Sequence, residues 1–547
     1  MNNFFSSIGT ELAKSCNNVG NNKISNIQFN PNTFYPEPIE EFEILEILSS
    51  ININKSNRPE DIPNSFIKLS KTVITPILTK LINLIFLQGK FPQILKNTSI
   101  IPIHKAGDDQ QCCNHRPISM TSPFSKIVEK CMFKRMDNFL TKFNIINPRQ
   151  FGFQKGVSTE DAVNSIYNNY INAIERNEIT CSIFLDIKKA FDAVDHQLLL
   201  TKLYRYGFRG KFYELLKSFL SERYQLVMIQ GVFSELQKVV CGVPQGSVLG
   251  PQFFKIFIND IPLISKFDTH IFADDTCLSI TNTNPNLLEK IVITELGKIS
   301  TWFKTNKLCL NYTKTWYMIT TNKKINYNFN IKIDNHPILE AQEVKYLGVT
   351  IDKKLTWKSH LSNVVTKVSR GSYALSRLRH FVNMETLRKV YHALVHPHLQ
   401  YCLMSWGTAA ITNFNKLFVK QKIILKLMTF NIFNTPSNPI FLQLNLLKLP
   451  DMYKLKIAIS TYNSTNTNNQ NNNNIVPLDS IHNYGTRSRQ RGDLFVPSVR
   501  TTKGQRSFTY QSSIIWNNIP LNIRKSTSVQ IFKNKFKQYL ISQYNLP

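Results

Sequence analysis

Two short apolar segments that carry acidic residues constrain this chain more than any other feature of its sequence. Residues 181–186 are a short apolar run that ends at Asp186, and such a run predicts a buried strand. Residues 269–280 are apolar, then acidic, then apolar again, which predicts two strands joined by a tight turn at Asp274 and Asp275. We therefore expect a sheet whose strand ends present three carboxylates.

Carboxylates at rigid strand ends suit the chemistry of nucleotide transfer. Two Mg2+ ions about 3.5–4 Å apart, held by carboxylates, stabilise the charge on the attacking and leaving oxygens at one phosphorus. Mg2+ prefers hard oxygen ligands, and a rigid backbone keeps such ligands in place. Each segment alone has an ordinary structural explanation, because an Asp pair is common in turns and an Asp after a strand often caps a helix. Their combination is what favours a catalytic site.

The rest of the chain predicts a mixed helical and stranded protein. Residues 98–106 predict a strand followed by a turn, and residues 344–351 predict part of a further hairpin. Apolar residues at helical spacing predict helices over residues 39–89, 123–145, 158–175, 246–261 and 356–381, and more helix follows to about residue 430.

Two segments show no such periodicity. Residues 1–40 are polar and Asn-rich, and we expect them to be extended. Residues 463–474 are low-complexity and are expected to form a disordered linker.

The net charge narrows the choice of partners. Lys and Arg total 66 against 36 Asp and Glu, which gives a formal charge of +30. A field of this strength favours a polyanionic partner, although a basic protein without a specific partner explains the charge alone equally well. An anionic membrane is a third alternative, which no long basic amphipathic segment supports.

The cysteines and the apolar stretches bear on compartment and metal content. The nine cysteines include no C-x-x-C pair, and no second ligand pair follows Cys112 and Cys113, so we expect reduced thiols and no zinc. The N-terminus lacks the pattern of a signal peptide, and the apolar stretch 73–87 carries Lys80 and is too short to span a bilayer. These observations predict an intracellular protein, nuclear or cytoplasmic and not secreted, without a membrane partner.

Three motifs in a fixed order point to a family. Residues 184–192 read Phe-Leu-Asp-Ile-Lys-Lys-Ala-Phe-Asp, residues 242–251 read Gly-Val-Pro-Gln-Gly-Ser-Val-Leu-Gly-Pro, and residues 272–275 read Phe-Ala-Asp-Asp. Together they resemble the successive palm motifs of reverse transcriptases from non-LTR (LINE-type, Jockey-like) retrotransposons. The likeness extends from about residue 40 to about residue 350 and continues more weakly to the C-terminus. Three ordered motifs are far more specific than a lone Phe-Ala-Asp-Asp.

The resemblance implies a role for each matching position. Asp186, Asp274 and Asp275 would be the catalytic, metal-binding carboxylates. Phe191 would lie under the incoming sugar and leave no room for a 2′-OH, the group that distinguishes RNA from DNA; in most proteins such a Phe is an ordinary core residue. The other implied site residues are Lys105, Arg116, Gln245, Gly246 and Lys314 for nucleotide binding, and Gln150, Gly152, Tyr346, Leu347 and Gly348 for primer or template binding.

The implied nucleotide contacts have a physical rationale. Lys105 would meet the triphosphate as a point charge and Arg116 as a fork, whereas without the resemblance they would be two solvated surface charges. Gln245 would pack on the nucleotide and template, and Gly246 would allow close backbone approach. The ordinary alternative for these two residues is a Pro-Gly turn.

The implied fold is α+β, a right-hand polymerase with fingers, an antiparallel-sheet palm and a helical thumb, followed by a C-terminal extension. The reverse transcriptase domain is expected over about 85–352. In chain order we expect a linker remnant at 1–40, the N-terminal part of the fingers at 41–175, the palm at 176–352 with a fingers insertion at about 205–238, the thumb at 353–432, a connector with the Asn-rich linker at 433–474, and a basic C-terminal unit at 475–547.

The implied function is RNA-directed DNA polymerisation. A primer 3′-OH would attack a dNTP on an RNA or DNA template, with two Mg2+ ions, for which Mn2+ can substitute. One alternative is a decayed retroelement copy that only binds nucleic acid, and another is a related palm enzyme such as an intron maturase or a telomerase subunit.

Residues 58–61 depart from the usual Gly-Pro-Asp-Gly, and His115 stands where Tyr is common. Proteins of this type carry an endonuclease before the polymerase, so this chain is expected to be truncated, and the sequence does not indicate an oligomeric state.

Overall fold

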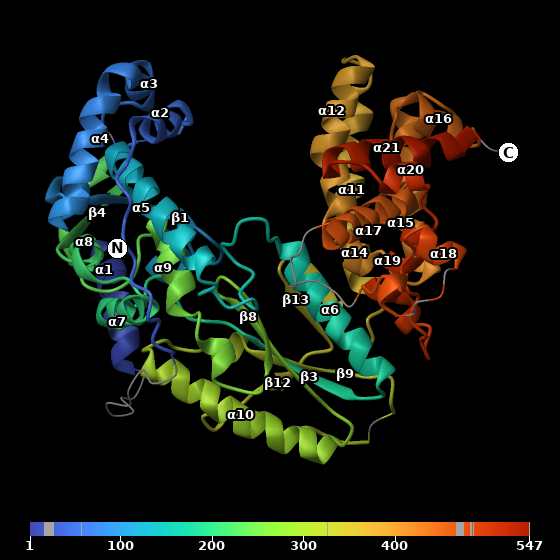
Figure 1. Cartoon of the computed structure of the whole chain (residues 1–547), viewed down its shortest axis with the longest axis horizontal. Coiled ribbons are helices and arrows are strands. Elements are labelled where there is room, and N and C mark those ends of the chain that lie inside the picture. The colour runs from blue at the N-terminus through green and yellow to red at the C-terminus, as the bar shows by residue number, and fades with distance from the viewer. Residues whose placement is uncertain are drawn as a thin grey trace.

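The protein is seen here in a computed structural model of its 547 residues. Figure 1 shows a central sheet at the base, with one group of helices from the first half of the chain on one side and a second group from the C-terminal part on the other. The chain is mixed helix and sheet, as its sequence predicts. The structure describes residues 1–15, 27–55, 57–58, 60–324, 326–466, 475–481, 484 and 486–545.

The N-terminal half is built around a mixed sheet and its helices. Strand β1 pairs antiparallel with β2 and parallel with β4, and β4 also pairs with β5 and β6. The strands are β1 (Thr98–His104), β2 (His115–Met120), β4 (Arg223–Ile229), β5 (Val232–Phe233) and β6 (Gln237–Val239). The helices of this half are α2 (Glu41–Ser49), α3 (Asn64–Leu69), α4 (Lys71–Gln88), α5 (Pro123–Lys142), α7 (His196–Tyr206), α8 (Gly210–Leu220) and α9 (Leu249–Phe257).

The expectation of an extended N-terminal segment is wrong over its first residues, which form helix α1 (Asn2–Ser15). Phe5 is buried in a small cluster with Ile100 and Val227 of the mixed sheet. The Asn2 side-chain amide donates to the Gln225 carbonyl at 3.3 Å and to the Glu235 carbonyl at 2.7 Å. These contacts stabilise a helix that its polar composition did not suggest.

The central sheet has the strand order β12-β9-β3-β8-β7. Strand β12 pairs parallel with β9, and the other pairs are antiparallel. Because alternate residues of β3 point to opposite faces, Ile183 packs in the core that includes helix α10 (Pro285–Thr305), and Phe184 packs in the core that includes helix α6 (Thr159–Glu175). The strands are β3 (Ile179–Leu185), β7 (Asp268–Phe272), β8 (Asp275–Asn282), β9 (Trp316–Thr320) and β12 (Leu339–Glu340), and a small hairpin of β10 (Lys332–Ile333) and β11 (His336–Pro337) lies between β9 and β12 in sequence.

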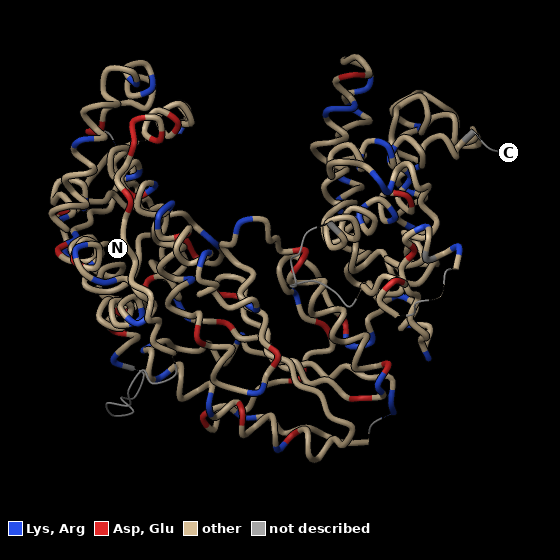
Figure 2. The backbone as a smooth tube through the Cα atoms, in the orientation of Figure 1, with Lys and Arg blue, Asp and Glu red and all other residues tan. Residues whose placement is uncertain are grey.

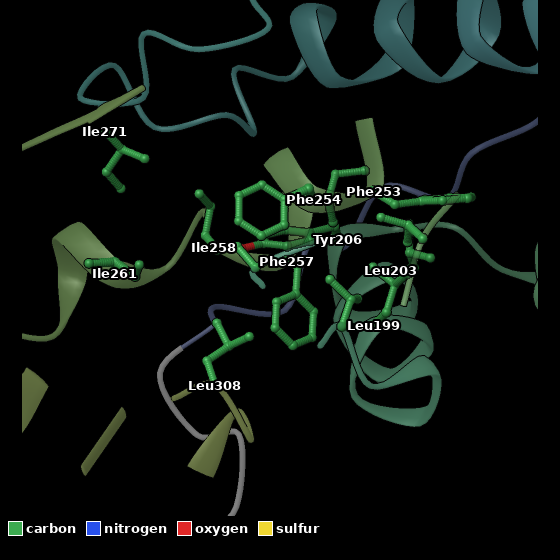
Figure 3. Packing of buried hydrophobic residues seen from close by; sticks show 14 of the residues in the cluster. Leu199, Leu203, Tyr206, Phe253, Phe254, Phe257, Ile258, Ile261, Ile271 and Leu308 are labelled. Carbon is green, nitrogen blue, oxygen red and sulfur yellow. The ribbon is translucent and has the colours of Figure 1, made fainter. Parts of the chain in front are cut away.

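The larger core joins the helices of the first half to the central sheet. Figure 3 shows Leu203 of α7, Phe253 and Phe257 of α9, and Ile271 of β7 gathered in this core. All residues of α9 except Pro251 are buried, which explains why most of its side chains are apolar. Because one hydrophobic core includes both the helices of the first half and the central sheet, these helices are held against the sheet.

The C-terminal part is a helical assembly that follows a hairpin of β13 (Glu343–Tyr346) and β14 (Val349–Asp352). Leu361, Trp406, Trp516 and Phe532 belong to one hydrophobic core, so residues before and after position 432 pack together. We expected a disordered linker at 463–474. Residues 463–466 instead form the end of α17, and residues 467–474 lie outside the described part of the chain. The helices are α11 (Lys358–Leu378), α12 (Met384–Leu394), α13 (His396–Gln400), α14 (Leu403–Trp406), α15 (Ile411–Met428), α16 (Ser437–Gln443), α17 (Leu449–Asn466), α18 (Arg487–Gln490), α19 (Phe508–Asn517), α20 (Leu521–Arg524) and α21 (Val529–Ser542).

Two expectations drawn from apolar and sulfur-containing residues need correction. The apolar stretch 73–87 belongs to α4, which has 18 residues and is, by length and composition alone, long and apolar enough to cross a membrane. Its Ile82 and Phe86 are nevertheless buried in the protein core. Cys309 forms a disulfide, whereas the expectation was of reduced thiols throughout. The free cysteines among the described residues are Cys112, Cys113, Cys131, Cys181, Cys241, Cys277 and Cys402.

Candidate active site

The central sheet brings the three predicted carboxylates to one edge. Strand β3 ends at Leu185, which pairs with Thr276, so Asp186 and Asp275 follow as neighbours on adjacent antiparallel strands. Phe272 pairs with Asp275 and closes a hairpin whose turn contains Ala273 and Asp274. Ala273 has φ +56°, a left-handed conformation that tightens this turn.

The electrostatics of this edge agree with its geometry. Loss of solvation and, after it, the nearby carboxylates of Asp274 and Asp186 raise the pKa of the Asp275 carboxyl to about 6, against the attraction of Lys105. Asp274 and Asp275 are nevertheless exposed at the surface, so water moderates their repulsion. An uncompensated group of carboxylates is a place where a cation would be stabilised.

The donor set fits a hard divalent cation, but the carboxylates are not closed into a ligand cage. Within the described part of the chain, no group of three or more His, Cys, Asp and Glu side chains lies close enough together to hold a metal ion. The structure thus places Asp186, Asp274 and Asp275 in one neighbourhood and leaves their side chains spread across it.

Asn311 holds Asp186 in place, a role that the sequence did not reveal. The Asn311 side-chain amide donates to Asp186 Oδ2 at 2.8 Å, and its backbone N–H donates to the Asp186 carbonyl at 2.8 Å. The predicted nucleotide-binding Lys314 lies three residues further along the chain and lines a cavity of about 510 Å3 together with Asp186 and Asp275. The family-like motif at residues 310–314 was the only feature of the sequence that pointed to Asn311, and it did not indicate the hydrogen bond to Asp186.

Gly152 packs directly against the turn that carries Asp274. A Cβ atom at position 152 would lie 2.4 Å from the Ala273 nitrogen and 3.0 Å from the Phe272 carbonyl carbon. The backbone N–H groups of Phe151 and Gly152 donate to the Ile271 carbonyl at 2.7 Å and 3.3 Å. The glycine is therefore required for close approach of two backbones, a reason that differs from the template contact implied by the family resemblance.

Phe191 and Gln245 belong to one connected group. The Phe191 ring stacks on Phe254 with centroids 4.6 Å apart, and its carbonyl accepts from the Val243 N–H at 2.9 Å. The Gln245 side-chain amide donates to Asp192 Oδ1 at 2.8 Å, and burial raises the pKa of the Asp192 carboxyl to about 6. Asp192 thus couples the Phe191 segment to the Gln245 loop.

Two glycines fix this group against its surroundings. Gly246 has φ +118°, and a Cβ there would lie 2.7 Å from the Ser119 carbonyl oxygen. A Cβ on Gly9 of helix α1 would lie 2.1 Å from the Asp192 carbonyl oxygen. Helix α1 therefore supports the segment behind Phe191, which no pattern in residues 1–15 indicated.

The predicted triphosphate-binding residues lie on and beside the β1–β2 hairpin. Arg116 is on β2 opposite Ile103, and Lys105 follows β1, where its N–H donates to the Asn114 carbonyl at 2.9 Å. Both side chains are exposed. Lys105 attracts the Asp275 carboxylate and opposes the rise of its pKa.

The predicted primer- or template-binding residues fall into different environments. Gln150 is buried, and its side-chain amide donates to the Lys255 carbonyl at 2.9 Å, so its side chain faces the interior. Tyr346 is buried on β13, with its hydroxyl donating to the His270 carbonyl at 3.4 Å. Leu347 and Gly348 form the turn to β14 with φ +44° and +79°, and the Tyr401 hydroxyl donates to the Leu347 carbonyl at 2.6 Å.

Comparison with known proteins indicates a family for the part of the chain that carries these residues. Residues 103–351 match the family model described as reverse transcriptase (RNA-dependent DNA polymerase). The chain is 29% identical over 406 residues to the probable RNA-directed DNA polymerase from transposon BS of Drosophila melanogaster. The aligned region covers 72% of this chain and 45% of that protein. It is also 29% identical over 398 residues to the RNA-directed DNA polymerase from mobile element jockey of the same organism, covering 70% of this chain and 43% of that protein. The chain thus spans less than half the length of these curated relatives.

Proposed function

We propose that the chain is an RNA-directed DNA polymerase, because residues 103–351 match the reverse transcriptase family model and the chain is similar to the polymerases of transposon BS and of mobile element jockey. It would join a dNTP to a primer 3′-OH on an RNA template and release pyrophosphate. The observation that carries the proposal is the meeting of Asp186, Asp274 and Asp275 at one edge of the central sheet, inside this domain.

The reaction depends mainly on positioning and on charge. Two Mg2+ ions, for which Mn2+ can substitute, would supply charge neutralisation at the phosphorus when they are bound. Asp186, Asp274 and Asp275 would hold them, and Asn311 would keep Asp186 oriented through its hydrogen bond to Oδ2. Lys314 stands in the same cavity, where its ammonium group can attract the leaving pyrophosphate.

The parts of the polymerase follow from this assignment. We assign the fingers to the β1–β2 hairpin and the helices around it, with Lys105 and Arg116 gripping the triphosphate. The palm is the central sheet with α10 and with α6, which we expected in the fingers but which packs against Phe184 of the sheet. The thumb begins at α11, after the Tyr346–Gly348 turn that would grip the primer. The reverse transcriptase domain would then span about residues 85–352, ahead of the helices that form the C-terminal extension.

Primer extension on poly(rA) annealed to oligo(dT), with dTTP and Mg2+, tests the proposed activity directly. We expect extension products that depend on the divalent metal. A well-folded chain that binds the primer–template but adds no nucleotide would overturn the proposal and favour the nucleic-acid-binding alternative.

Replacing Phe191 with Val should relax the choice between deoxyribonucleotides and ribonucleotides. The ring is held by its stacking on Phe254, so shortening it opens space where a 2′-OH would project. We expect the ratio of kcat/KM for dNTP over rNTP to fall at least about tenfold, a change of ~1.4 kcal/mol. Phe191→Tyr keeps the ring and should keep the ratio; an unchanged ratio in Phe191→Val would make Phe191 a plain core residue.

Replacing Gly152 with Ala should slow extension although the new methyl group touches no substrate. The methyl would meet backbone atoms of the hairpin turn at 2.4 Å and 3.0 Å, so the turn that carries Asp274 must move. Misplacement of catalytic groups by about 1 Å can cost on the order of 10²-fold in rate, and we expect a loss of about 10- to 100-fold.

Gly297→Ala is the matched control for this substitution. Gly297 lies in α10, and a Cβ there meets nothing within 4 Å. It should leave the rate unchanged and slightly raise stability, because Ala favours a helix over Gly. Equal rates for the two variants would show that the turn tolerates the displacement.

A further inference from the structure

A cavity of about 560 Å3 lies where the start of α6 meets the C-terminal helices α12, α13, α17 and α21. Its floor is apolar and includes Met404, Leu447 and Leu455. Figure 2 shows Lys and Arg positions along the helices of this C-terminal assembly, which Figure 1 labels α12, α17 and α21. The basic side chains that line the cavity are His392, His396, Lys456, Lys533 and Lys537.

The two acidic residues in the cavity wall are already engaged. Glu160 forms an ion pair with Lys456, and Asp161 accepts from the Ser158 N–H at 2.8 Å as part of the capping box of α6. Lys533 and Lys537, by contrast, form no ion pair with any residue that the structure describes. The three lysines in the lining outnumber the two carboxylates, so the cavity keeps a small net positive charge, which Lys533 and Lys537 supply.

The two lysines of α21 that line the cavity lie close enough to repel each other, whereas burial lowers the pKa of the His396 ring to about 4 and leaves that ring neutral. The His392 and His396 ring centroids are 4.9 Å apart, and His396 Nδ1 is buried without a hydrogen-bond partner among the described residues. Burial lowers the pKa of the Lys537 ammonium, and Arg388 and Lys533 lower it further. A bound anion would relieve this repulsion and would give the buried nitrogen a partner.

The position of the cavity indicates which anion it takes. Its wall includes Gly156 and Glu160, which continue the segment that packs at Gly152 against the Asp274 turn. A nucleic-acid strand that followed residues 152–160 away from the Asp274 turn would meet this cavity. An apolar floor with a cationic rim suits a nucleotide chain, because bases and sugars can lie on the floor while phosphates meet the rim.

We propose that this cavity is a second nucleic-acid site, which binds the phosphate backbone of a single-stranded RNA template outside the polymerase centre. The identity of the strand as template rests on the proposed function. The binding itself requires neither catalysis nor a metal ion, because the contacts are direct hydrogen bonds from the Lys and His side chains, and those from Lys are charge-assisted.

The test compares two double charge reversals that alter the net charge equally. Lys533→Glu/Lys537→Glu changes the cavity, whereas Lys525→Glu/Lys535→Glu changes exposed Lys residues that do not line it. Affinity for a labelled single-stranded RNA is measured by fluorescence anisotropy in EDTA, without dNTP, between 50 and 200 mM salt, and thermal melting checks the fold of both variants.

We expect the cavity variant to bind at least about tenfold more weakly than the control variant. Because each lost phosphate contact lowers the salt slope for a single strand by about 0.7, the slope should fall by about 1.4. Equal weakening in the two variants, or none, would overturn the proposal. Competition by poly-glutamate as strong as that by RNA would also overturn it, because the cavity would then be a general anion site.

A parallel extension assay keeps the two proposals apart. If the wild type adds no nucleotide but the cavity variant still loses RNA affinity, the polymerase assignment fails and the cavity site stands. If extension is normal and the two variants bind alike, the cavity site fails and the polymerase assignment stands.

Discussion

Replacing Asp274 with Asn is expected to lower the rate of primer extension by at least about 100-fold, a change of ~2.7 kcal/mol, while primer–template affinity stays within about twofold. The side chain lies in the turn between β7 and β8, beside Asp275 and across from the end of β3. Asn keeps the size and the turn geometry but removes the negative charge, so it weakens a metal ligand without removing a phosphate contact.

The exposed acid Glu385 provides the control. It lies on α12 and forms an ion pair with Lys389, on the surface of the C-terminal helices. Glu385→Gln removes the same charge and should leave both extension and binding unchanged. If Asp274→Asn retains more than about a tenth of the wild-type rate, a cost below ~1.4 kcal/mol, Asp274 is not a metal ligand in this reaction.

The second large effect is expected on stability, at the buried pair of Lys202 and Asp260. Lys202 Nζ lies 2.7 Å from Asp260 Oδ1, both side chains are almost fully enclosed, and Trp302 Nε1 donates to Asp260 Oδ2 at 2.9 Å. Burial lowers the pKa of the Lys202 ammonium against the attraction of Asp260. Removing one partner leaves the other charge buried and unpaired, so Lys202→Met should lower the free energy of unfolding by about 3–5 kcal/mol.

The double variant Lys202→Met/Asp260→Leu isolates the cause of that loss. With no charge left in the pocket, much of the stability should return, because an apolar pair of similar volume is often as stable as a buried ion pair. Urea unfolding of the wild type, both single variants and the double variant gives the cycle. Additive losses would show that the cost comes from altered packing and not from an unpaired charge.

The sequence by itself determined most of the local structure and suggested the chemistry that we propose. Apolar runs bounded by polar residues predicted β3 and the β7–β8 hairpin, and the predicted turn contains Asp274. Helical periodicity likewise predicted α5, α6 and α11 within a few residues. These features can be predicted locally, because the spacing of buried side chains along a strand or helix appears as a spacing of apolar residues within a short stretch of sequence.

Only the tertiary structure decided what supports the site. The sequence pattern of Gly152 is the same whether it contacts a template or the Ala273 backbone, and the fold brings it to Ala273. Gln150 was expected at a nucleic-acid surface, but its side chain is buried against the Lys255 carbonyl. Residues 2–15 look polar and unstructured, yet Phe5 and Asn2 find partners more than 90 residues away and form a helix. Each of these outcomes depends on contacts between distant segments, and packing and hydrogen-bond satisfaction across such distances leave no periodic trace in the sequence.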